Sequence, residues 1–339
     1  MQRAWKLLAS LIITTMLSMC CPYYVVRVAS SPTYYDQRFA IIDQSPSGRP
    51  IAGVNLVISG IKETLKTGAD GSVELNLVPA GILEIVATWK SIYNPEPVTI
   101  ATSSVVLDRT LDITIVSKVY DVELKLVSSS GKPIVNAEVR LAGVPLGMTG
   151  TDGKVIAMQV PGYYKYEHRP YPVAATWLGE DVSPGDVDIT ATGTYVLTAK
   201  NVSTLTVHVT GAQGQGLKAA QVEIKTASGI TVFSGLSNEQ GFVSVEVPYG
   251  TYGIRADYKG FTNAATTTVN SPEGTVHTVQ TSVFVEALGM AMSFATFVLW
   301  MIVAIIVALA LAIAIHEYHI YRRKRLPQLF GAPRGVVKS

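Results

Sequence analysis

His316-Glu317-Tyr318-His319 is the stretch that comes nearest to a catalytic metal motif. The zinc-binding motif HExxH places its histidines four residues apart on one face of a helix, so that both imidazoles reach the same ion. Here the two histidines are three residues apart, so that geometry is not met. We interpret both as polar residues at the end of a membrane helix. The remaining histidines are far apart and have no cysteine or paired serine beside them: His168, His208 and His277.

Acidic side chains are the second candidate for a chemical site. Glu180 and Asp181 are followed closely by Asp186 and Asp188, and carboxylate oxygens are the ligands that calcium prefers. A run of this kind is more often a solvated loop, and we favour that interpretation. We therefore predict no catalytic residue, no metal site and no cofactor, and hydrolase activity is the least favoured class of function.

The elements that carry these residues belong to a repeat. Glycines at positions 48, 131 and 214 are 83 residues apart, and each opens a run in which apolar and polar residues alternate. Alternation with a period of two residues predicts a half-buried β-strand. The shared apolar positions are predicted to form the core: Ile51, Val54, Leu56 and Ile58; Ile134, Ala137, Val139 and Leu141; Leu217, Ala220, Val222 and Ile224.

A turn follows each of these runs. Asp70-Gly71 and Asp152-Gly153 predict tight hairpin turns, because glycine readily adopts the positive φ that such turns need. Gln240-Gly241 keeps the glycine and predicts a weaker turn. Beyond the turn the alternation continues and predicts further buried positions, although Gln159 departs from the pattern: Val73, Leu75 and Leu77; Val155, Ala157 and Gln159; Val243, Val245 and Val247.

About seven short strands per repeat, and no helical period in the body, predict an all-β fold. We expect three tandem immunoglobulin-like antiparallel β-sandwiches, over residues 35–117, 118–203 and 204–285, followed by one C-terminal transmembrane helix.

The order of G-x-P, T-x-x-D-G and [L/V]-P-x-G in these repeats resembles that of carboxypeptidase regulatory-like or transthyretin-like domains, relatives of the Cna B-type surface modules. The resemblance covers about 250 of 339 residues. It implies a β-sandwich and says almost nothing about function, because such modules serve as spacers, adhesin stalks and accessory domains. Some Cna B-type modules form a Lys–Asn or Lys–Asp isopeptide bond. Only Lys125 stands on a first strand here, without a matching glutamate motif.

The N-terminus, 1–29, predicts a secretory signal peptide. Arg3 and Lys6 precede an uncharged apolar run from Leu7 to Met19. Two alternatives stay open: an uncleaved anchor from Leu7 to Val26, and lipidation at Cys20. Cys20 and Cys21 are the chain's only cysteines, so the body has no disulfide and each domain depends on its own core.

The C-terminus predicts a membrane anchor. Residues 287–315 are 29 consecutive uncharged residues, more than the roughly 20 needed to cross a bilayer. The tail at 316–339 carries Arg322, Arg323, Lys324 and Arg325, which the positive-inside rule places in the cytoplasm. The body from Ser30 to Glu286 has 18 Lys and Arg against 24 Asp and Glu, which argues against nucleic-acid binding. We predict a single-pass type I protein of the cell membrane, with an extracellular body.

Two positions in the body are candidates for contact or modification. The second repeat has an insertion of about six residues that is rich in tyrosine and proline, a composition typical of binding loops. We expect its residues either to contact a protein partner or, for the first two, to cap the core: Tyr163, Tyr164, Tyr166, His168, Arg169 and Tyr171. Asn201 begins an Asn-x-Ser sequon at a predicted domain boundary, where glycosylation would be accessible.

These observations favour a non-enzymatic surface protein whose sandwiches form a stalk or an interaction module, in cell-envelope or surface-layer anchoring or in adhesion. A prokaryotic source suits the lack of disulfides. The alternative is an accessory subunit of a membrane transporter or enzyme that holds an exported partner. Whether copies of the chain associate is left open.

Overall fold

The computed structural model describes residues 33–164, 169–287 and 289–329. The predicted signal segment and the end of the basic tail lie outside these residues. The chain divides into two compact units. One holds 33–41, Pro50–Ala87 and Thr102–Ile115, and the other holds Ile42–Arg49, Thr88–Ala101 and everything described from Val116 onward. The three predicted domain boundaries therefore stay predictions.

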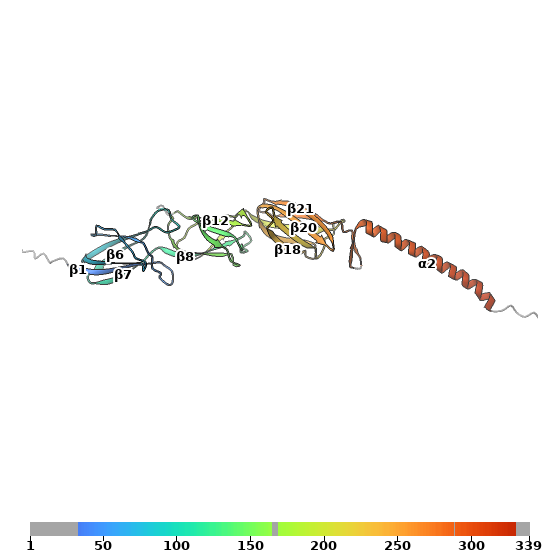
Figure 1. Cartoon of the computed structure of the whole chain (residues 1–339), viewed down its shortest axis with the longest axis horizontal. Helices are drawn as coiled ribbons and strands as arrows, with labels where there is room; N and C mark the ends of the chain where they lie inside the picture. Colours follow the sequence, from blue (N-terminus) through green and yellow to red (C-terminus); the bar gives the residue numbers. More distant parts are fainter. Residues whose placement is uncertain (1–32, 165–168, 288, 330–339) are drawn as a thin grey trace, which may run out of the picture. The chain divides into compact units, whose positions relative to one another are not determined.

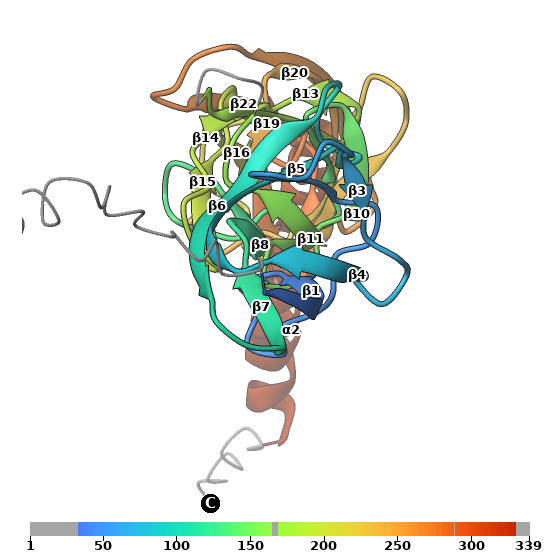
Figure 2. The same ribbon diagram turned by 90° about the vertical axis from the view of Figure 1, so that its left-hand side faces the viewer.

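The first repeat supplies seven strands, which form two sheets with the orders β4-β1-β7 and β3-β2-β5-β6. Figure 1 labels β1, β6 and β7. In Figure 2, β1 lies between β4 and β7. The strands are β1 (Tyr34–Ile42), β2 (Asn55–Ile58), β3 (Leu65–Lys66), β4 (Ser72–Pro79), β5 (Gly81–Trp89), β6 (Val98–Leu107) and β7 (Leu111–Val116).

The second repeat follows the same order, with sheets β11-β8-β15 and β10-β9-β12-β13, and with β14 also paired to β12. Its strands are β8 (Val119–Val127), β9 (Glu138–Leu141), β10 (Val144–Met148), β11 (Lys154–Pro161), β12 (Tyr171–Trp177), β13 (Glu180–Asp181), β14 (Gly185–Val187) and β15 (Gly193–Thr198).

The third repeat forms sheets β19-β16-β22 and β18-β17-β20-β21. Its strands are β16 (Val202–Thr210), β17 (Gln221–Thr226), β18 (Thr231–Leu236), β19 (Phe242–Pro248), β20 (Gly250–Tyr258), β21 (Phe261–Val269) and β22 (Thr275–Gln280). Leu205 and Val207 from one sheet share a buried core with Val222 and Ile224 from the other. The all-β prediction is therefore confirmed.

One part of the predicted topology is wrong. The last strand of each described pair runs parallel to the first: β15 to β8, and β22 to β16. Each last strand arrives after its chain has crossed from the opposite sheet, so it is not forced to reverse direction as the second strand of a hairpin is. The sheets are therefore mixed and not purely antiparallel.

The Asp-Gly turns are present but are not hairpin turns. β3 and β4, like β10 and β11 or β18 and β19, belong to different sheets, so each turn carries the chain across the sandwich. Gly71, Gly153 and Gly241 all have positive φ, at 70°, 76° and 83°. Their carbonyls accept hydrogen bonds from the first strand of each repeat, with N···O distances of 2.8–2.9 Å: Ile41 N to Gly71 O, Leu126 N to Gly153 O and Val209 N to Gly241 O.

A buried hydroxyl precedes each of these turns. Thr149 Oγ1 donates to Ile134 O at 2.7 Å and accepts from Ala137 N at 2.9 Å, and so joins both ends of the segment after the G-x-P turn. Two buried hydroxyls make the equivalent pair of bonds in the other repeats: Thr67 with Ile51 and Val54, and Ser237 with Leu217 and Ala220.

The third turn compensates for its missing aspartate. Asp152 Oδ1 accepts from Lys154 N at 3.2 Å, and Asp70 makes the same bond to Ser72 N. In the third repeat Asn238 Oδ1 takes this role, accepting from Phe242 N at 2.8 Å. The turn therefore keeps its side-chain acceptor, although Gln240 stands where the other two repeats have an aspartate.

The predicted core position Leu77 is wrong, because Leu77 lies in a β-bulge; Gln159, which departs from the apolar pattern, lies in the equivalent bulge of the second repeat. Both residues have positive φ, at 58° and 53°, and Leu77 is 71% exposed. The strand shifts by one residue, and Val78 and Val160 enter the core instead. An aspartate of the first strand accepts each bulged N–H: Asp36 for Leu77 at 3.2 Å, and Asp121 for Gln159 at 2.9 Å. The bulge explains why a glutamine is tolerated in an otherwise apolar pattern.

The apolar C-terminal helix begins at Phe294, whereas the predicted span begins at residue 287. Residues from 287 onward first form a small hairpin, β23 (Val285–Ala287) with β24 (Met290–Met292), and α2 then runs over Phe294–Leu329. Ser293 caps the helix: its Oγ accepts from Thr296 N at 3.3 Å, and its carbonyl accepts from Phe297 N at 2.9 Å. Gly289, with φ of 77°, allows the hairpin turn that keeps the helix from starting at 287.

We use the term crossing turn for the Gly71, Gly153 and Gly241 turns that carry the chain from one sheet to the other. A pair of matched glycine variants tests whether close packing of this turn against the first strand stabilises the repeat. A Cβ on Gly153 would lie 2.6 Å from Leu126 O, whereas one on Gly131, at a similar φ, would meet nothing within 4 Å. Gly131→Ala should cost about 1–2 kcal/mol of unfolding free energy, the usual cost of left-handed backbone. Gly153→Ala should cost about 2–4 kcal/mol, because overpacking is added. Equal losses in thermal unfolding of the two variants would contradict this role.

Candidate interaction surface

Of the predicted contact residues that the structure describes, only Tyr171 lies in the protein core. Its side chain is 1% exposed, and its hydroxyl donates to Pro161 O at 2.7 Å and to Tyr163 O at 2.9 Å. In the third repeat Tyr252 is equally buried and donates to Pro248 O at 2.6 Å. Burial raises the pKa of both phenols. Tyr171 is therefore the framework tyrosine of its repeat, and it is not available to a partner.

The β5–β6 connection meets the inserted segment. Asn94 Nδ2 donates to Tyr163 O at 3.0 Å and to Tyr171 Oη at 3.2 Å. Tyr93, 5% exposed, belongs to the same buried cluster as Tyr171, and burial raises its phenol pKa. The loop and the insertion are thus joined by the hydrogen bonds of the Asn94 side chain, within the second compact unit.

The start of the insertion is half-buried. Tyr163 Oη accepts from Lys118 Nζ at 2.7 Å, and Tyr164 packs on Tyr171 with ring centroids 5.0 Å apart. Arg169 is exposed. Tyr166 and His168 lie outside the described residues. A partner contact at Tyr163, Tyr164, Tyr166, His168 and Arg169 stays a prediction.

Asn201 lies on the surface, immediately before β16. It is exposed, and its side-chain amide donates to Asp181 O at 3.3 Å. Its own carbonyl accepts from Tyr249 N at 2.7 Å. Glycosylation there stays a prediction.

The other candidates from the sequence are separated in space. Within the described residues, no three His, Cys, Asp or Glu side chains come together as a metal site would need. Asp181 instead accepts from the Ser183 hydroxyl and backbone N–H, which hold its pKa below the ordinary value. His208 stacks on Phe242 with ring centroids 4.0 Å apart. Lys125 lies beside Val196 of the last strand, an apolar residue that cannot form an isopeptide bond.

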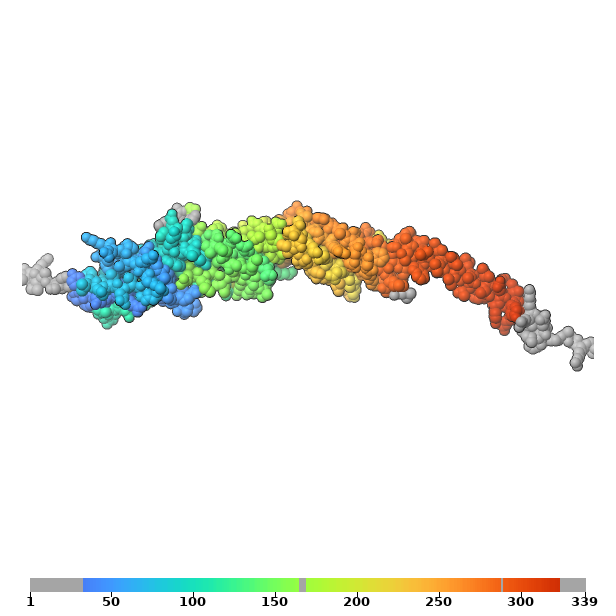
Figure 3. Space-filling model, in the orientation of Figure 1, coloured from blue at the N-terminus to red at the C-terminus, as the bar shows by residue number. Residues whose placement is uncertain are grey.

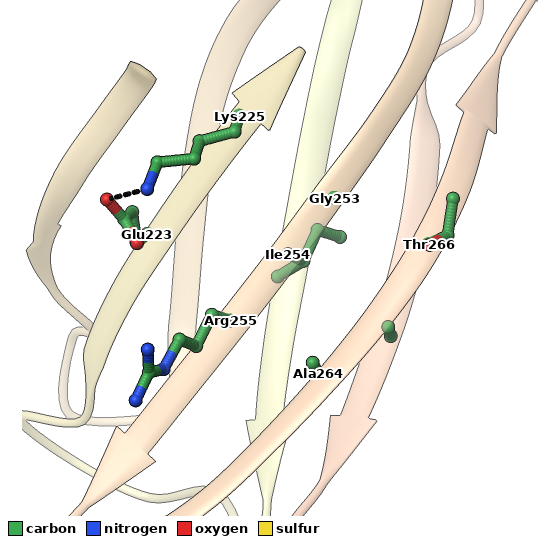
Figure 4. Close-up of a pocket in the computed structure, with 8 residues that line it drawn as sticks. Glu223, Lys225, Gly253, Ile254, Arg255, Ala264 and Thr266 are labelled. Atoms are coloured by element: carbon green, nitrogen blue, oxygen red, sulfur yellow. Dashed lines mark ion pairs between the residues drawn. The ribbon is translucent and has the colours of Figure 1, made fainter. Parts of the chain in front are cut away.

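A surface hollow that sequence reasoning missed lies on the four-stranded sheet of the third repeat (Figure 4). Its volume is about 510 Å³, and β17, β20 and β21 form its floor. Gly253 and Ala264 have little or no side chain, so they leave space between the longer side chains of Lys225 and Arg255. A glycine in a strand can signal this kind of close approach.

Charged side chains surround the hollow. Glu223 forms an ion pair with Lys225 at 2.8 Å, while Arg255 makes no ion pair with any described residue. A second hollow of about 350 Å³ shares Glu223 and Arg255 and adds Asp257. This face is open and of mixed charge, so it suits a polar surface contact and not an enclosed substrate.

The third repeat is connected to α2 through the hairpin. Lys259 Nζ and Tyr258 Oη both donate to the Glu286 carboxylate, and Lys259 also donates to Gly289 O at 2.8 Å. The Lys259 bond, followed by that of Tyr258, holds the pKa of Glu286 below its ordinary value. Phe284 packs on Phe294 and Phe297 of the helix, with ring centroids 5.0 and 5.4 Å apart. The hairpin therefore has specific contacts with both neighbours.

The α2 surface is apolar. The segment Phe294–Arg323 has 30 residues and a mean hydropathy of 3.1 in its most apolar window, with none of that window buried. Every side chain from Val298 to Arg323 is exposed. Figure 3 shows one face of this helix, coloured in orange to red. By length and composition, it is a candidate membrane span.

Comparison with known proteins does not assign the chain to a family. No family model matches it, and no curated protein matches it. Similar solved structures include the Bacillus anthracis TIE protein, with 17% identity, a TM-score of 0.23, and coverage of 73% of this chain but 50% of that one. A streptococcal ancillary pilin is 15% identical over 73% of this chain and 98% of its own, with a TM-score of 0.26. Klebsiella pneumoniae 5-hydroxyisourate hydrolase is 17% identical over 23% of this chain and 90% of its own, with a TM-score of 0.19. These scores are too low to support an inference, and the family resemblance stays a prediction.

Removing the buried hydroxyl should show that Tyr171 is structural. Tyr171→Phe should lower the unfolding free energy by about 1–2 kcal/mol, because Asn94 and two carbonyls lose a buried partner. Tyr195→Phe is the matched control: the Tyr195 hydroxyl donates to Ala191 O at 2.8 Å and accepts from Thr190 N and Ala191 N, each at 3.0 Å. These three bonds are exposed, so water can replace them and the cost should be below about 0.5 kcal/mol. Chemical denaturation of the detergent-solubilised chain measures both. Equal effects would contradict a core role for Tyr171.

Glu286 should control the order of the hairpin. Glu286→Gln removes the charge that Lys259 binds, so we expect several-fold faster amide hydrogen exchange in Met290–Met292. Glu273→Gln is the control, since no ion pair in the described part of the chain involves Glu273.

The same contact predicts a pH dependence. The folded-state pKa of Glu286 is depressed, so its stabilisation is fully present above the ordinary pKa of 4.5. It is lost as the pH falls through the lower folded-state value. Below that value, hairpin exchange in the wild type, corrected for intrinsic rates, should match that of the glutamine variant. A persistent difference would contradict the contact.

Proposed function

We propose that this chain is a non-enzymatic single-pass membrane protein whose repeated β-sandwiches lie outside the cell and act as a structural stalk or interaction module. The observation that carries the proposal is the exposed apolar surface of α2. Its apolar side chains from Val298 to Ile315 are all exposed, which is unfavourable in water and favourable in lipid.

The charge distribution supports an orientation with the body outside. Arg322 to Arg325 follow the apolar segment after six residues, whereas the body is acidic. Cationic residues beside a span remain on the cytoplasmic side. Tyr318 and Tyr321, on the last turns before this run, suit the membrane interface.

The hairpin supports a mechanical role. Contacts from Lys259 to Glu286 and from Phe284 to the start of α2 connect a folded domain to its anchor through short, specific interactions. A long flexible linker would transmit position and force less directly. The repeated fold and the open, mixed-charge hollow suit placement and surface contact better than chemistry.

The alternative, an accessory subunit of a transporter or enzyme, gains no support from the helix. Partner helices in a membrane commonly hydrogen-bond to polar side chains within a span. Here Ser293 and Thr296 bond to each other at 3.0 Å, at the very start of α2, where they serve as its cap. Cell-envelope or surface-layer anchoring and adhesion are the roles that we favour.

Single cysteines test the topology, because the described body contains none. Ala227→Cys, on the exposed β17–β18 connection, should react with a membrane-impermeant maleimide on intact cells. Ser339→Cys, at the end of the tail, should react only after permeabilisation. The wild type measures any background from Cys20 and Cys21.

Reversed labelling would contradict the orientation, and labelling of both sites only after permeabilisation would contradict export. Purification from gently solubilised membranes tests the role itself. Stoichiometric recovery with transporter or enzyme subunits would replace the stalk by the accessory-subunit function.

A further inference from the structure

Strand β21 is an unprotected edge. It is the outermost strand of the sheet β18-β17-β20-β21, and it pairs with β20 over nine consecutive positions, from Phe261↔Tyr258 to Val269↔Gly250, without a bulge. None of its nine residues, FTNAATTTV, is charged or a proline. Exposed edges of folded proteins usually carry a charge, a proline or a bulge that prevents pairing with another chain.

The backbone groups of β21 that point away from β20 can be identified. The Ala264 N–H is bonded to Asn263 Oδ1 at 2.8 Å, so it points away from β20. In an antiparallel ladder the outward direction recurs at every second residue. The outward N–H and C=O groups therefore belong to Thr262, Ala264, Thr266 and Thr268, all of which are exposed.

Several other edges in the same part of the molecule are protected; β15 and β22 are, like β21, free of charge, proline and bulges, but each has only six residues. On the opposite edge of the sheet, the pairing of β18 is interrupted by a bulge between Ile224 and Lys225. In the second repeat the strands next to β12 are the short β13 and β14, which contain Glu180, Asp181 and Asp186. β6 is also uncharged, but Ile100 O on this strand already accepts from Lys118 N at 2.7 Å.

We propose that β21 pairs antiparallel with β21 of a second copy of this chain, about a two-fold axis at Ala265. This register places Thr262 opposite Thr268, and Ala264 opposite Thr266. Each outward residue then meets another outward residue, so the hydrogen-bonding groups of both strands match.

Pairing with an identical strand is more favourable for β21 than it would be for an edge strand that carries charged residues. Identical strands bring identical residues close together, so a charged residue would meet its own charge across the axis, which is unfavourable. The four outward side chains here are three threonines and one alanine, and threonine pairs across strands are favourable. The Asn263 amide must leave the Ala264 N–H when the second strand binds. Its other bond, from Nδ2 to Gln280 O on β22, involves no backbone group of β21.

Disulfide trapping of the full chain in detergent tests the register. The double variant Ala264→Cys/Thr266→Cys should form a covalent dimer that reductant reverses, because each new cysteine faces its counterpart in the second copy. Thr251→Cys, on the neighbouring strand and the same face, is the matched control and should stay monomeric. Equal trapping in both variants would overturn the proposed contact.

A charge variant tests the edge without a covalent link. In sedimentation of the wild-type chain we expect a reversible dimer, and Thr266→Lys should weaken it several-fold or more, because it places two lysines near each other across the axis. Thr231→Lys puts the same charge on the opposite edge of the sheet and should leave the dimer unchanged.

Each other result overturns the proposal. A wild-type chain that is monomeric at all concentrations tested would do so. So would a dimer that survives Thr266→Lys, since α2 or another surface would then hold it. Loss of the dimer in Ser104→Lys, on β6, but not in Thr266→Lys would assign association to the first repeat. None of these measurements depends on the topology in the membrane.

Discussion

The crossing turn that presses a glycine against the first strand is the contact on which each repeat depends. Gly71, Gly153 and Gly241 have positive φ, and their carbonyls accept from the first strand. A side chain on any of them would collide with backbone within 2.9 Å. Because the turn passes from one sheet to the other, its position determines the register of the first strand with the fourth and the closure of the core between the sheets.

The buried hydroxyl before the turn makes this contact specific. Thr67, Thr149 and Ser237 each satisfy one carbonyl and one N–H that the change of sheet leaves without a ladder partner. A buried backbone group without a partner costs stability, so the hydroxyl is needed where neither sheet can supply a bond. This framework is the same in all three repeats, and the repeats differ in other places. The second repeat has an insertion, and the third has a hollow and the uncharged edge strand β21.

The third repeat carries most of the features that bear on function. One of its sheets has the hollow beside Arg255 and ends in the uncharged edge β21, and its chain continues through the hairpin into α2. The same fold can serve very different roles, so function must be argued from such features and not from the sandwich. Here they support the proposed surface contact and anchoring, since a shallow face and an open edge can meet another surface but do not enclose a substrate.

The sequence by itself determined the all-β class, the strand alternation, the glycine turns and the apolar C-terminal segment, because each depends on local periodicity or on the conformation of a single residue. Only the tertiary structure decided what those elements face. It placed Leu77 and Gln159 on bulges supported by Asp36 and Asp121, and it showed that the last strands run parallel to the first. The tertiary structure also showed that Tyr171, a predicted partner contact, lies in the core. The sequence alone could have indicated this, because Tyr171 aligns with Tyr252 once the six-residue insertion is allowed for. The hollow and the exposed edge could not be predicted from the sequence. Whether a strand lies at an edge depends on which strands pair with it, and those strands come from distant parts of the chain.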